Sequence, residues 1–432
     1  MASRENLDGR VKNAEILFNS REFEAAHAEF SELLQDHPSD PIILNYIALL
    51  DFKKGRVKKA IEGLELSIFN NPEYIDANFN LGLVFHHKRQ FEDAIYYLGK
   101  VLRLAPKYGK AYFLLAKIFC SQGKYVEAIG GYYRGLEIAP QYADGYFELA
   151  ILFKKCAKLD DSIWAYDKYL ELCPNSAEAY NNLGNVCKLA GINNRAIEAY
   201  RKAISINPDI DNAQHFLSVL TNNISERAPS GYIKRFFNSY ANHFEEHLVQ
   251  NLGYNTPTLF LDEIKKLKSK NTIYNNVIDL GCGTGLSGEL FRPLAKTLIG
   301  VDLSSNMLSI AREKNIYDNL LEGEIVEKLS QINKQFDLFI CADVIVYFGE
   351  LNSLFKEIKN YSRPSSLFIF STENLELGEY NLNSEGRYSH NPNYIVSLAK
   401  TLGFTVLRNT KINLRLEKGY WIKGGLFIFR CG

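Results

Sequence analysis

Small and large apolar positions recur at a fixed spacing of 34 residues through the first half of the chain. Six prolines keep the same spacing, at Pro38, Pro72, Pro106, Pro140, Pro174 and Pro208. Aligned on these prolines, the chain divides into six units: 7–40, 41–74, 75–108, 109–142, 143–176 and 177–210. A period of this length predicts an array of helical hairpins, in which each unit buries its apolar face against its neighbours.

Two columns of small side chains predict where the paired helices approach closely. The eighth position of every unit is Ala or Gly, and the twentieth is Ala in all units except one, where Ser162 stands. Proline lacks an N–H and restricts the residue before it, so each proline should end the second helix of its unit. Gly55, Gly123 and Gly191 fall at the turn between the helices, where glycine adopts an open backbone easily.

These columns resemble the tetratricopeptide repeat over about half of the chain. The resemblance implies an all-α solenoid over residues 7–223, with 211–223 as a closing helix, and a protein or peptide partner in the concave groove. By position, that groove would present Phe79, His86, Lys110, Phe113, Lys117, Phe147, Lys154 and Lys188. Such a mixture favours an acidic, partly apolar ligand; the alternative is a solvated lysine face with phenylalanines that fill gaps between repeats.

After residue 220 the period ends and strand and helix patterns alternate. Short apolar runs predict strands at 277–281, 298–301, 336–341, 366–370, 404–407 and 425–429. Helix patterns lie between them: one to Ala295, one through Met307 capped by Ser304 or Ser305, one over 351–360 and one over 393–402. This alternation predicts an α/β fold with a mostly parallel sheet covered on both faces.

The junction between the halves contains breaker residues and then an aromatic helix. Residues 224–231, ISERAPSG, have no periodicity and form the predicted linker. Residues 232–254 repeat aromatic and histidine side chains every three or four positions, which predicts either a helix packed on the next domain or a lid over a ligand pocket. His243 and His247 are four residues apart with no third ligand in sight, so we expect no metal site.

The segment Gly281-Cys282-Gly283-Thr284-Gly285 follows the first predicted strand directly. In a parallel sheet, ligands bind beyond the carboxyl ends of the strands, where glycines allow a tight turn and close backbone approach. Asp302 ends the next strand and would accept two ribose hydroxyls, or else cap a helix. Gly283, Gly285 and Gly288 also match the weak GxGxxG dinucleotide pattern, but counted from Gly281 the spacing is GxGxG.

DLGCGTG followed by VDLS resembles the class I S-adenosylmethionine-dependent methyltransferases, and the wider segments look like predicted methyltransferases that carry tetratricopeptide repeats. The resemblance implies a Rossmann-like, seven-stranded domain over 232–432 with S-adenosylmethionine as cofactor. Gly281, Gly283 and Gly285 would then pass under the donor, Asp279 would orient the loop and face its amino group directly or through water, and Asp302 would hold the ribose. The remaining donor contacts implied in this way are Leu303, Glu324, Ala342 and, from the lid, Tyr240 beside Phe244.

A base is needed only if the methyl acceptor must lose a proton. The principal candidates are Asp343, Glu373 and His390, and the secondary candidates are Tyr347, Tyr388 and His243. Glu373 follows the fifth predicted strand, and Tyr388 and His390 lie in the predicted loop beyond it, where all three could reach the mouth of the pocket. Histidine has the best ordinary pKa for this task. The position after the fourth strand reads Ala342-Asp343-Val344-Ile345, unlike an NPPY-type amine-methylating tetrad. Oxygen, carboxylate and protein side-chain acceptors therefore remain open.

Composition limits the kinds of partner and the cellular compartment that we expect. Lys+Arg and Asp+Glu are equal at 50 each, which argues against a nucleic-acid partner. The seven scattered cysteines, the polar start and the absence of a long apolar run favour reduced thiols, no membrane and a cytoplasmic location. A scaffold that keeps the fold without the chemistry and a nicotinamide-dependent reductase are the alternatives to methyl transfer.

Overall fold

The chain forms two compact units, Met1–Ile192 and Asn193–Gly432. The computed structural model describes residues 2–267 and 272–431. The division falls inside the sixth repeat of the sequence, N-terminal to the linker predicted at 224–231. The second helix of that repeat and the closing helix therefore belong to the same compact unit as the α/β domain. In the described ranges, no helix has both the length and the apolarity to cross a membrane.

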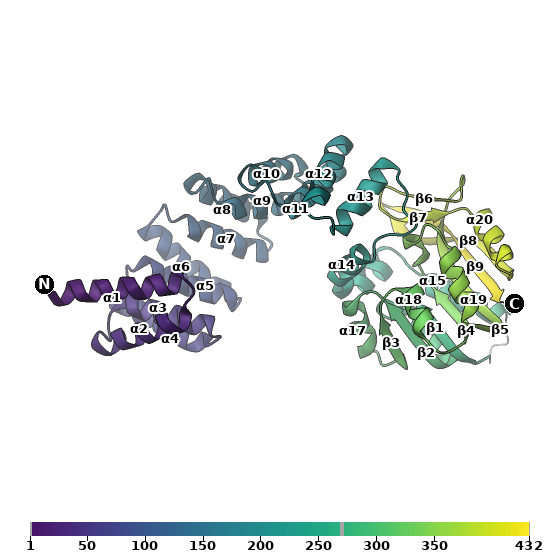
Figure 1. Cartoon of the computed structure of the whole chain (residues 1–432), viewed down its shortest axis with the longest axis horizontal. Coiled ribbons are helices and arrows are strands. Elements are labelled where there is room, and N and C mark those ends of the chain that lie inside the picture. Colours follow the sequence, from purple (N-terminus) through teal and green to yellow (C-terminus); the bar gives the residue numbers. More distant parts are fainter. Residues whose placement is uncertain (1, 268–271, 432) are drawn as a thin grey trace. The chain divides into compact units, whose positions relative to one another are not determined.

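The first unit consists of helices joined by short turns (Figure 1). They are α1 (Ala2–Asn19), α2 (Phe23–Asp36), α3 (Pro41–Lys53), α4 (Val57–Asn70), α5 (Ile75–His87), α6 (Phe91–Leu104), α7 (Gly109–Ser121), α8 (Tyr125–Ile138), α9 (Ala143–Lys155), α10 (Leu159–Leu172) and α11 (Ala177–Leu189). In the second unit, α12 (Asn193–Ile206) completes the sixth repeat and α13 (Asp211–Thr221) follows it. The helical solenoid predicted from the period is confirmed.

The repeat pattern acts as predicted at the helix ends. In every repeat the second helix ends two residues before the proline, at Asp36, Asn70, Leu104, Ile138, Leu172 and Ile206. The turn inside each hairpin has one left-handed residue, with φ between 57° and 75°, at Arg21, Gly55, Arg89, Gly123, Ala157 and Gly191. Glycine adopts this φ without strain, and three of the repeats have glycine at this position. The other three hold a larger residue there, which adopts the left-handed conformation at some cost in energy.

The small-residue column is buried at the helix contacts, as expected. A Cβ at Gly82 would lie 3.1 Å from Leu98 Cγ, so even a methyl group there would require Leu98 to shift by a few tenths of an ångström. Several of the predicted groove residues contact other residues of the chain, and Phe113 and Lys117 are two examples. Phe113 is buried against Gly135, where an added Cβ would lie 2.5 Å from its ring, so Phe113 fills space between helices. Lys117 Nζ lies 3.1 Å from a carboxylate oxygen of Glu148.

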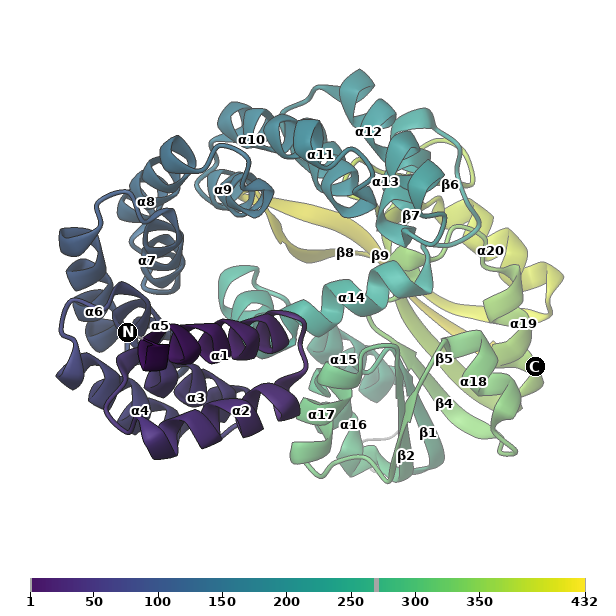
Figure 2. The same ribbon diagram turned by 60° about the vertical axis from the view of Figure 1, so that its left-hand side comes forward.

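The rest of the second unit is an α/β domain built on one sheet (Figure 2). Its strands are β1 (Tyr274–Leu280), β2 (Ala295–Asp302), β3 (Asn319–Glu322), β4 (Phe336–Cys341), β5 (Ser362–Asn374), β6 (Tyr380–Leu382), β7 (Tyr388–His390), β8 (Phe404–Glu417) and β9 (Tyr420–Cys431). Its helices are α14 (Ser230–Tyr240), α15 (Thr256–Leu267), α16 (Leu286–Phe291), α17 (Ser305–Glu313), α18 (Ile325–Gln331), α19 (Asn352–Asn360) and α20 (Pro392–Thr401).

The sheet order places the switch point between β1 and β4. Strands β3, β2, β1, β4 and β5 are parallel neighbours, β9 pairs antiparallel with β5, and β8 pairs with β9. These seven strands form the predicted Rossmann-like arrangement. The described sheet has nine strands, because the short hairpin β6–β7 is added where β5 extends past β4, with Glu373 paired to Ser389.

Two apolar cores lie on opposite faces of the sheet. One packs Phe355 of α19 and Ile395 of α20 against Phe368 of β5. The other packs Phe260 of α15 and Phe291 of α16 against Val277 of β1. Buried aliphatic and aromatic side chains on both faces explain why the central strands appear in the sequence as nearly continuous apolar runs. The helix expected to reach Ala295 instead ends at Phe291, because Arg292–Leu294 forms a 3₁₀ turn and Ala295 begins β2.

Candidate active site at the carboxyl edge of the sheet

The glycine loop after β1 has the backbone that its sequence predicts. Gly281, Gly283 and Gly285 all have positive φ, at 73°, 53° and 97°. The N–H groups of Gly281 and Cys282 donate to Val301 O of the neighbouring strand, at 2.8 and 3.0 Å. A Cβ at Gly281 would lie 2.2 Å from Val344 Cγ2, so the turn tolerates only glycine there. The loop is thus held against both β2 and the segment after β4.

Asp302, at the end of β2, ties this loop to the next helix. Its Oδ2 accepts a hydrogen bond from Gly283 N and its Oδ1 accepts one from Ser304 N, both at 2.8 Å. Burial raises the pKa of Asp302, against the opposing effect of these backbone N–H groups. Ser304 caps α17 as predicted, because its Oγ accepts from Met307 N at 3.1 Å. The carboxylate lines the cavity, so its remaining lone pairs can accept hydrogen bonds from a ligand.

One cavity of about 510 Å³ collects most of the predicted donor residues. Gly281, Gly283, Asp302, Leu303, Glu324, Ala342 and Tyr240 all line it. They come from the carboxyl ends of β1, β2 and β4, from the start of α18 and from the aromatic segment. Asp343, Arg387 and Arg415 line the same cavity, together with aromatic side chains that include Phe237 and Tyr347. The wall therefore combines an apolar majority with a few polar groups, as small-molecule sites usually do.

Glu324 has two partners within the chain. Its Oε2 accepts from Glu327 N at 3.0 Å, which makes it the N-cap of α18, and its Oε1 lies 3.5 Å from Arg227 Nη1. The residue thus fixes the start of α18 while it borders the cavity. Arg227 lies in the predicted linker, whose backbone bridges to the domain: Ala228 N donates to Tyr347 O at 2.9 Å.

The aromatic segment is not the single helix predicted over 232–254. It consists of α14, a 3₁₀ turn over Ala241–His243 and a π-helical turn over Glu246–Asn251. Tyr240, Phe244 and His247 line the cavity, where Tyr240 and Phe244 meet edge to face at 5.6 Å and Tyr240 OH contacts His247 Nδ1. His243 is exposed and lies outside the cavity lining.

Polar contacts anchor the aromatic segment to the domain. Asn238 Oδ1 accepts from Ser304 Oγ at 2.7 Å, and Lys314 Nζ lies 2.7 Å from Glu245 Oε1. In residues 2–267 and 272–431, no three histidine, cysteine or acidic side chains gather in a way that could hold a metal ion.

Asp279 lies behind the loop and outside the cavity lining. It is 1% exposed, and its Oδ2 accepts a hydrogen bond from Tyr317 OH at 2.7 Å. Burial raises the pKa of Asp279 to about 7, with the Tyr317 hydrogen bond acting in the opposite direction and Asp302 adding to the rise. This placement fits the predicted role of orienting the loop. Because Asp279 does not line the cavity, an interaction with the donor's amino group would run through water, and it stays a prediction.

The raised pKa predicts a pH-dependent stability. The folded pKa of about 7 lies above the ordinary value of 3.8, so between these pH values the folded chain holds more protons than the unfolded chain. The free energy of unfolding should therefore fall as pH rises through this window, by at most about 1.4 kcal/mol per pH unit. Urea unfolding at pH 5, 6, 7 and 8 should show the wild type losing stability relative to Asp279→Asn, which cannot titrate. A difference that does not change with pH would contradict this.

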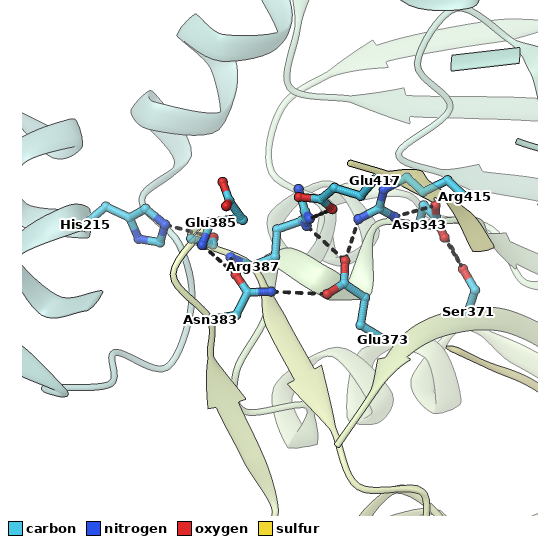
Figure 3. A network of polar contacts seen from close by, with 10 residues as sticks. His215, Asp343, Ser371, Glu373, Asn383, Glu385, Arg387, Arg415 and Glu417 are labelled. Carbon is cyan, nitrogen blue, oxygen red and sulfur yellow. Dashed lines mark hydrogen bonds and ion pairs between the residues drawn. The ribbon is translucent and has the colours of Figure 1, made fainter. Parts of the chain in front are cut away.

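Two of the candidate bases, Asp343 and Glu373, lie in a buried polar network, shown in Figure 3. Asp343 has φ of 55°; its Oδ1 accepts from Ser371 Oγ at 2.7 Å and its Oδ2 lies 3.2 Å from Arg415 Nη1. Burial raises the pKa of Asp343, and Arg415 opposes the rise. Glu373 is 4% exposed and does not line the cavity. It accepts hydrogen bonds from Arg415 and Arg387, so it serves as their shared counter-ion.

His390 is placed differently from our expectation of a loop residue at the pocket mouth. It ends β7, is fully buried, and its Nε2 lies 2.9 Å from Gly349 O. Because a carbonyl only accepts, Nε2 carries the proton. Burial lowers the pKa of His390 to about 4, and the residue is outside the cavity lining. Neither His390 nor Glu373 is in a position to take a proton from a molecule in the cavity.

Several residues of the site were not predicted, four polar ones among them. Arg387 and Arg415 line the cavity, Tyr317 binds Asp279, and Asn238 anchors the aromatic segment. No short motif carries them, since Tyr317 is 38 residues from Asp279 and Arg415 is 72 from Asp343. The only available signal was Arg415 within an apolar-flanked run, NLRLE, where a buried charge needs a partner.

Comparison with known families identifies both halves. Residues 278–370 match the family described as a methyltransferase domain. The chain carries a methyltransferase domain. Residues 11–73, 88–143 and 177–210 match tetratricopeptide-repeat families, so this domain follows an array of such repeats. Both resemblances drawn from the sequence are confirmed. The matched part of the methyltransferase domain runs from β1 to β5 and includes the glycine loop, Asp302 and Asp343.

Several curated proteins are similar to the methyltransferase domain. Malonyl-[acyl-carrier protein] O-methyltransferase of Yersinia pestis is 31% identical over 96 residues, which is 22% of this chain and 36% of that protein. A probable S-adenosylmethionine-dependent methyltransferase of Saccharomyces cerevisiae is 33% identical over 140 residues, 31% of this chain and 47% of that protein. Ubiquinone biosynthesis O-methyltransferase of Colwellia psychrerythraea is 26% identical over 123 residues, 27% of this chain and 50% of that protein. The chain thus spans half or less of the length of these relatives.

Proposed function

We propose that this protein transfers a methyl group from S-adenosylmethionine to an oxygen acceptor, and that its repeats bind a protein or peptide partner. The observation that carries the proposal is the convergence of the glycine loop, Asp302 and the end of β4 on one cavity at the switch point of the sheet. The methyltransferase family match and the names of the three relatives support the same reaction.

The residues at this site fit the proposed donor. A Cβ at Gly283 would meet no atom closer than Phe244 Cε1 at 3.8 Å, so the loop offers open backbone to a ligand. The carboxylate of Asp302 lines the cavity and has lone pairs left to accept from a ligand, which suits a ribose diol. Leu303, Met307 and Ile325 supply an apolar wall beside it, suited to an adenine ring. The donor, when bound, supplies a methyl group that is already activated for displacement.

The chain's own contribution is orientation and exclusion of water. Phe237, Tyr240 and Phe244 form the aromatic side of the cavity, and the anchors at Asn238 and Glu245 hold this segment in place. A largely apolar wall removes competing water from around the reacting groups. Holding the two reactants in line is then the main source of acceleration for such a transfer.

We infer further that the acceptor oxygen is a carboxylate, of a small molecule or of a protein-bound group. The predicted bases Glu373 and His390 lie outside the cavity, and Asp343 is paired with the Arg415 guanidinium, which favours its ionised form. An acceptor that is already ionised needs no base. Arg415 and Arg387 donate hydrogen bonds to the carboxylates of Asp343, Glu373 and Glu417. Among the described residues, Arg415 Nε and Arg387 Nη1 have no partner in these contacts. These two N–H groups suit a carboxylate oxygen.

Product formation with paired acceptors tests the acceptor class. S-Adenosylhomocysteine release would be followed with a panel of aliphatic and aromatic carboxylic acids, each beside the alcohol of the same carbon skeleton. We expect turnover with acids alone, at a rate that stays level from pH 6 to 8, since the acids are ionised throughout. Turnover of the alcohols, or a rate that rises steadily with pH, would show that a base operates and would contradict the carboxylate assignment.

Gly283→Val is expected to weaken S-adenosylhomocysteine binding at least about tenfold, because two methyl groups would project from a loop that lines the cavity. Valine at φ of 53° also strains the backbone. Gly419→Val is the matched control, since Gly419 has φ of 83° and nothing within 4 Å of an added Cβ. Calorimetric titration of both folded variants measures the difference. Equal affinity in the two would mean that the donor lies elsewhere. Titration with NADH separates the reductase alternative.

A further inference from the structure

The last helix of the repeat array, α13, packs on the methyltransferase domain within the second compact unit. His215 of α13 is 1% exposed, and its Nε2 donates to Gly386 O at 2.9 Å. The imidazole ring also stacks on Tyr232 of α14, with centroids 4.7 Å apart. Asp211, at the start of α13, pairs with Arg235 Nη2 at 3.0 Å. Helix α13 is therefore part of this unit's interior as well as the cap of the repeats.

The residue that His215 contacts lies in the tight turn between β6 and β7. Gly386 has φ of 81°, and a Cβ there would lie 2.7 Å from His215 Nε2 and 3.3 Å from Phe216 Cε1. The turn is closed by hydrogen bonds from Gly386 N to Asn383 O, at 2.9 Å, and from Asn383 N to Arg387 O, at 2.8 Å. The approach of α13 to this turn is as close as glycine permits.

The same turn presents Arg387 to the cavity. Asn383 Oδ1 accepts from Arg387 N at 3.0 Å, and Asn383 Nδ2 donates to Glu373 Oε2 at 3.2 Å. Arg387 Nε donates to Glu373 Oε1 at 2.9 Å, and the network continues through Arg415 to Asp343. Figure 3 shows the sequence of contacts from His215, on one side, to Asp343 and Ser371. A buried contact of the repeat cap is thus one residue away from a cavity arginine.

We propose that His215 is a positioning residue for the acceptor end of the cavity: the closing helix of the repeats holds the 383–387 turn and thereby Arg387. This rests on the proposed function, in which Arg387 faces the acceptor. It follows that the catalytic unit begins before α13. A chain cut at the predicted linker, 224–231, would lose His215 and leave Gly386 O without its partner, so slower turnover after such a cut would not by itself show that the repeats recruit the acceptor.

Chemical modification of Arg387 in the full chain tests this without any known acceptor. Phenylglyoxal reacts with guanidinium groups, and digestion with mass spectrometry gives the modification rate at each arginine. In His215→Ala the rate at Arg387 should rise about fivefold, as expected for release of one buried hydrogen bond. His215→Gln should restore the wild-type rate, because its amide N–H can still donate to Gly386 O. Arg408 of β8 serves as the internal reference, and its Nε lies 3.4 Å from Glu263 Oε2.

An unchanged Arg387 rate in folded His215→Ala, or no rescue by His215→Gln, would overturn the proposal. If His215→Ala does not fold, Gly386→Ala against Gly419→Ala answers the same question, since both glycines have positive φ and only Gly386 touches His215. Titration with S-adenosylhomocysteine is independent of this result. Failure of the wild type to bind this ligand would contradict the proposed function. The modification rate at Arg387 would still show whether His215 holds the 383–387 turn.

Discussion

Replacing Arg415 by methionine should lower the free energy of unfolding by about 3–5 kcal/mol, because the change leaves Asp343 and Glu373 as buried carboxylates without their common cation. Arg415 is 8% exposed and contacts both acids. Methionine preserves much of the side-chain volume, so the loss reports charge rather than packing. Urea unfolding at neutral pH, followed by circular dichroism, measures it.

Arg408→Met on the same strand is the control for Arg415→Met. The Arg408 side chain is 42% exposed and pairs with Glu263 at 3.4 Å, so its loss should cost less than about 1 kcal/mol. If Arg415→Met costs no more than Arg408→Met, the network around Asp343 does not hold the acceptor end together.

Asp302→Ala is expected to weaken S-adenosylhomocysteine binding by about 1.5–3 kcal/mol, which corresponds to roughly tenfold to 150-fold. The carboxylate that should hold the ribose diol is removed. Its hydrogen bonds to Gly283 N and Ser304 N are lost as well, so the loop itself should loosen. Calorimetric titration of the folded variant gives the change in affinity.

Glu322→Ala is the matched control for Asp302→Ala. Glu322 is the register partner of Asp302 on β3, and its carboxylate pairs with Lys234 at 2.6 Å outside the cavity lining. It should bind the ligand as the wild type does. Wild-type affinity in Asp302→Ala would show that the ribose is held by other groups.

The repeats and the donor loop were predictable because local sequence determines them. A 34-residue period repeats the same helix ends and small-residue contacts six times, so each prediction is tested by five other repeats. The glycine loop and the Ser304 cap likewise depend on residues within one turn of chain. The π-helical turn at 246–251 was not predicted, because the spacing of aromatic residues over 232–254 is also that of a regular helix.

The acceptor end was not predictable, because its contacts are between distant segments. Glu373 and His390 were expected near the pocket from their order after the fifth strand. Their side chains instead point to partners, Arg415 and Gly349, that lie 42 and 41 residues away. Strand β8 was expected to end at 407, yet it continues to Glu417 and turns at Lys418–Gly419, both of positive φ. The part of β8 beyond residue 407 contains Arg415, which lines the cavity, and for the turn itself only Gly419 was a signal.

Titration of S-adenosylhomocysteine into the full chain is the most direct test of the central claim, that the cavity at the end of β1, β2 and β4 is a methyl-donor site. The proposal predicts one bound ligand per chain with a dissociation constant in the range of about 1 μM to 1 mM, typical of enzyme ligands. No binding at millimolar concentration, in a protein shown to be folded by circular dichroism, would contradict it.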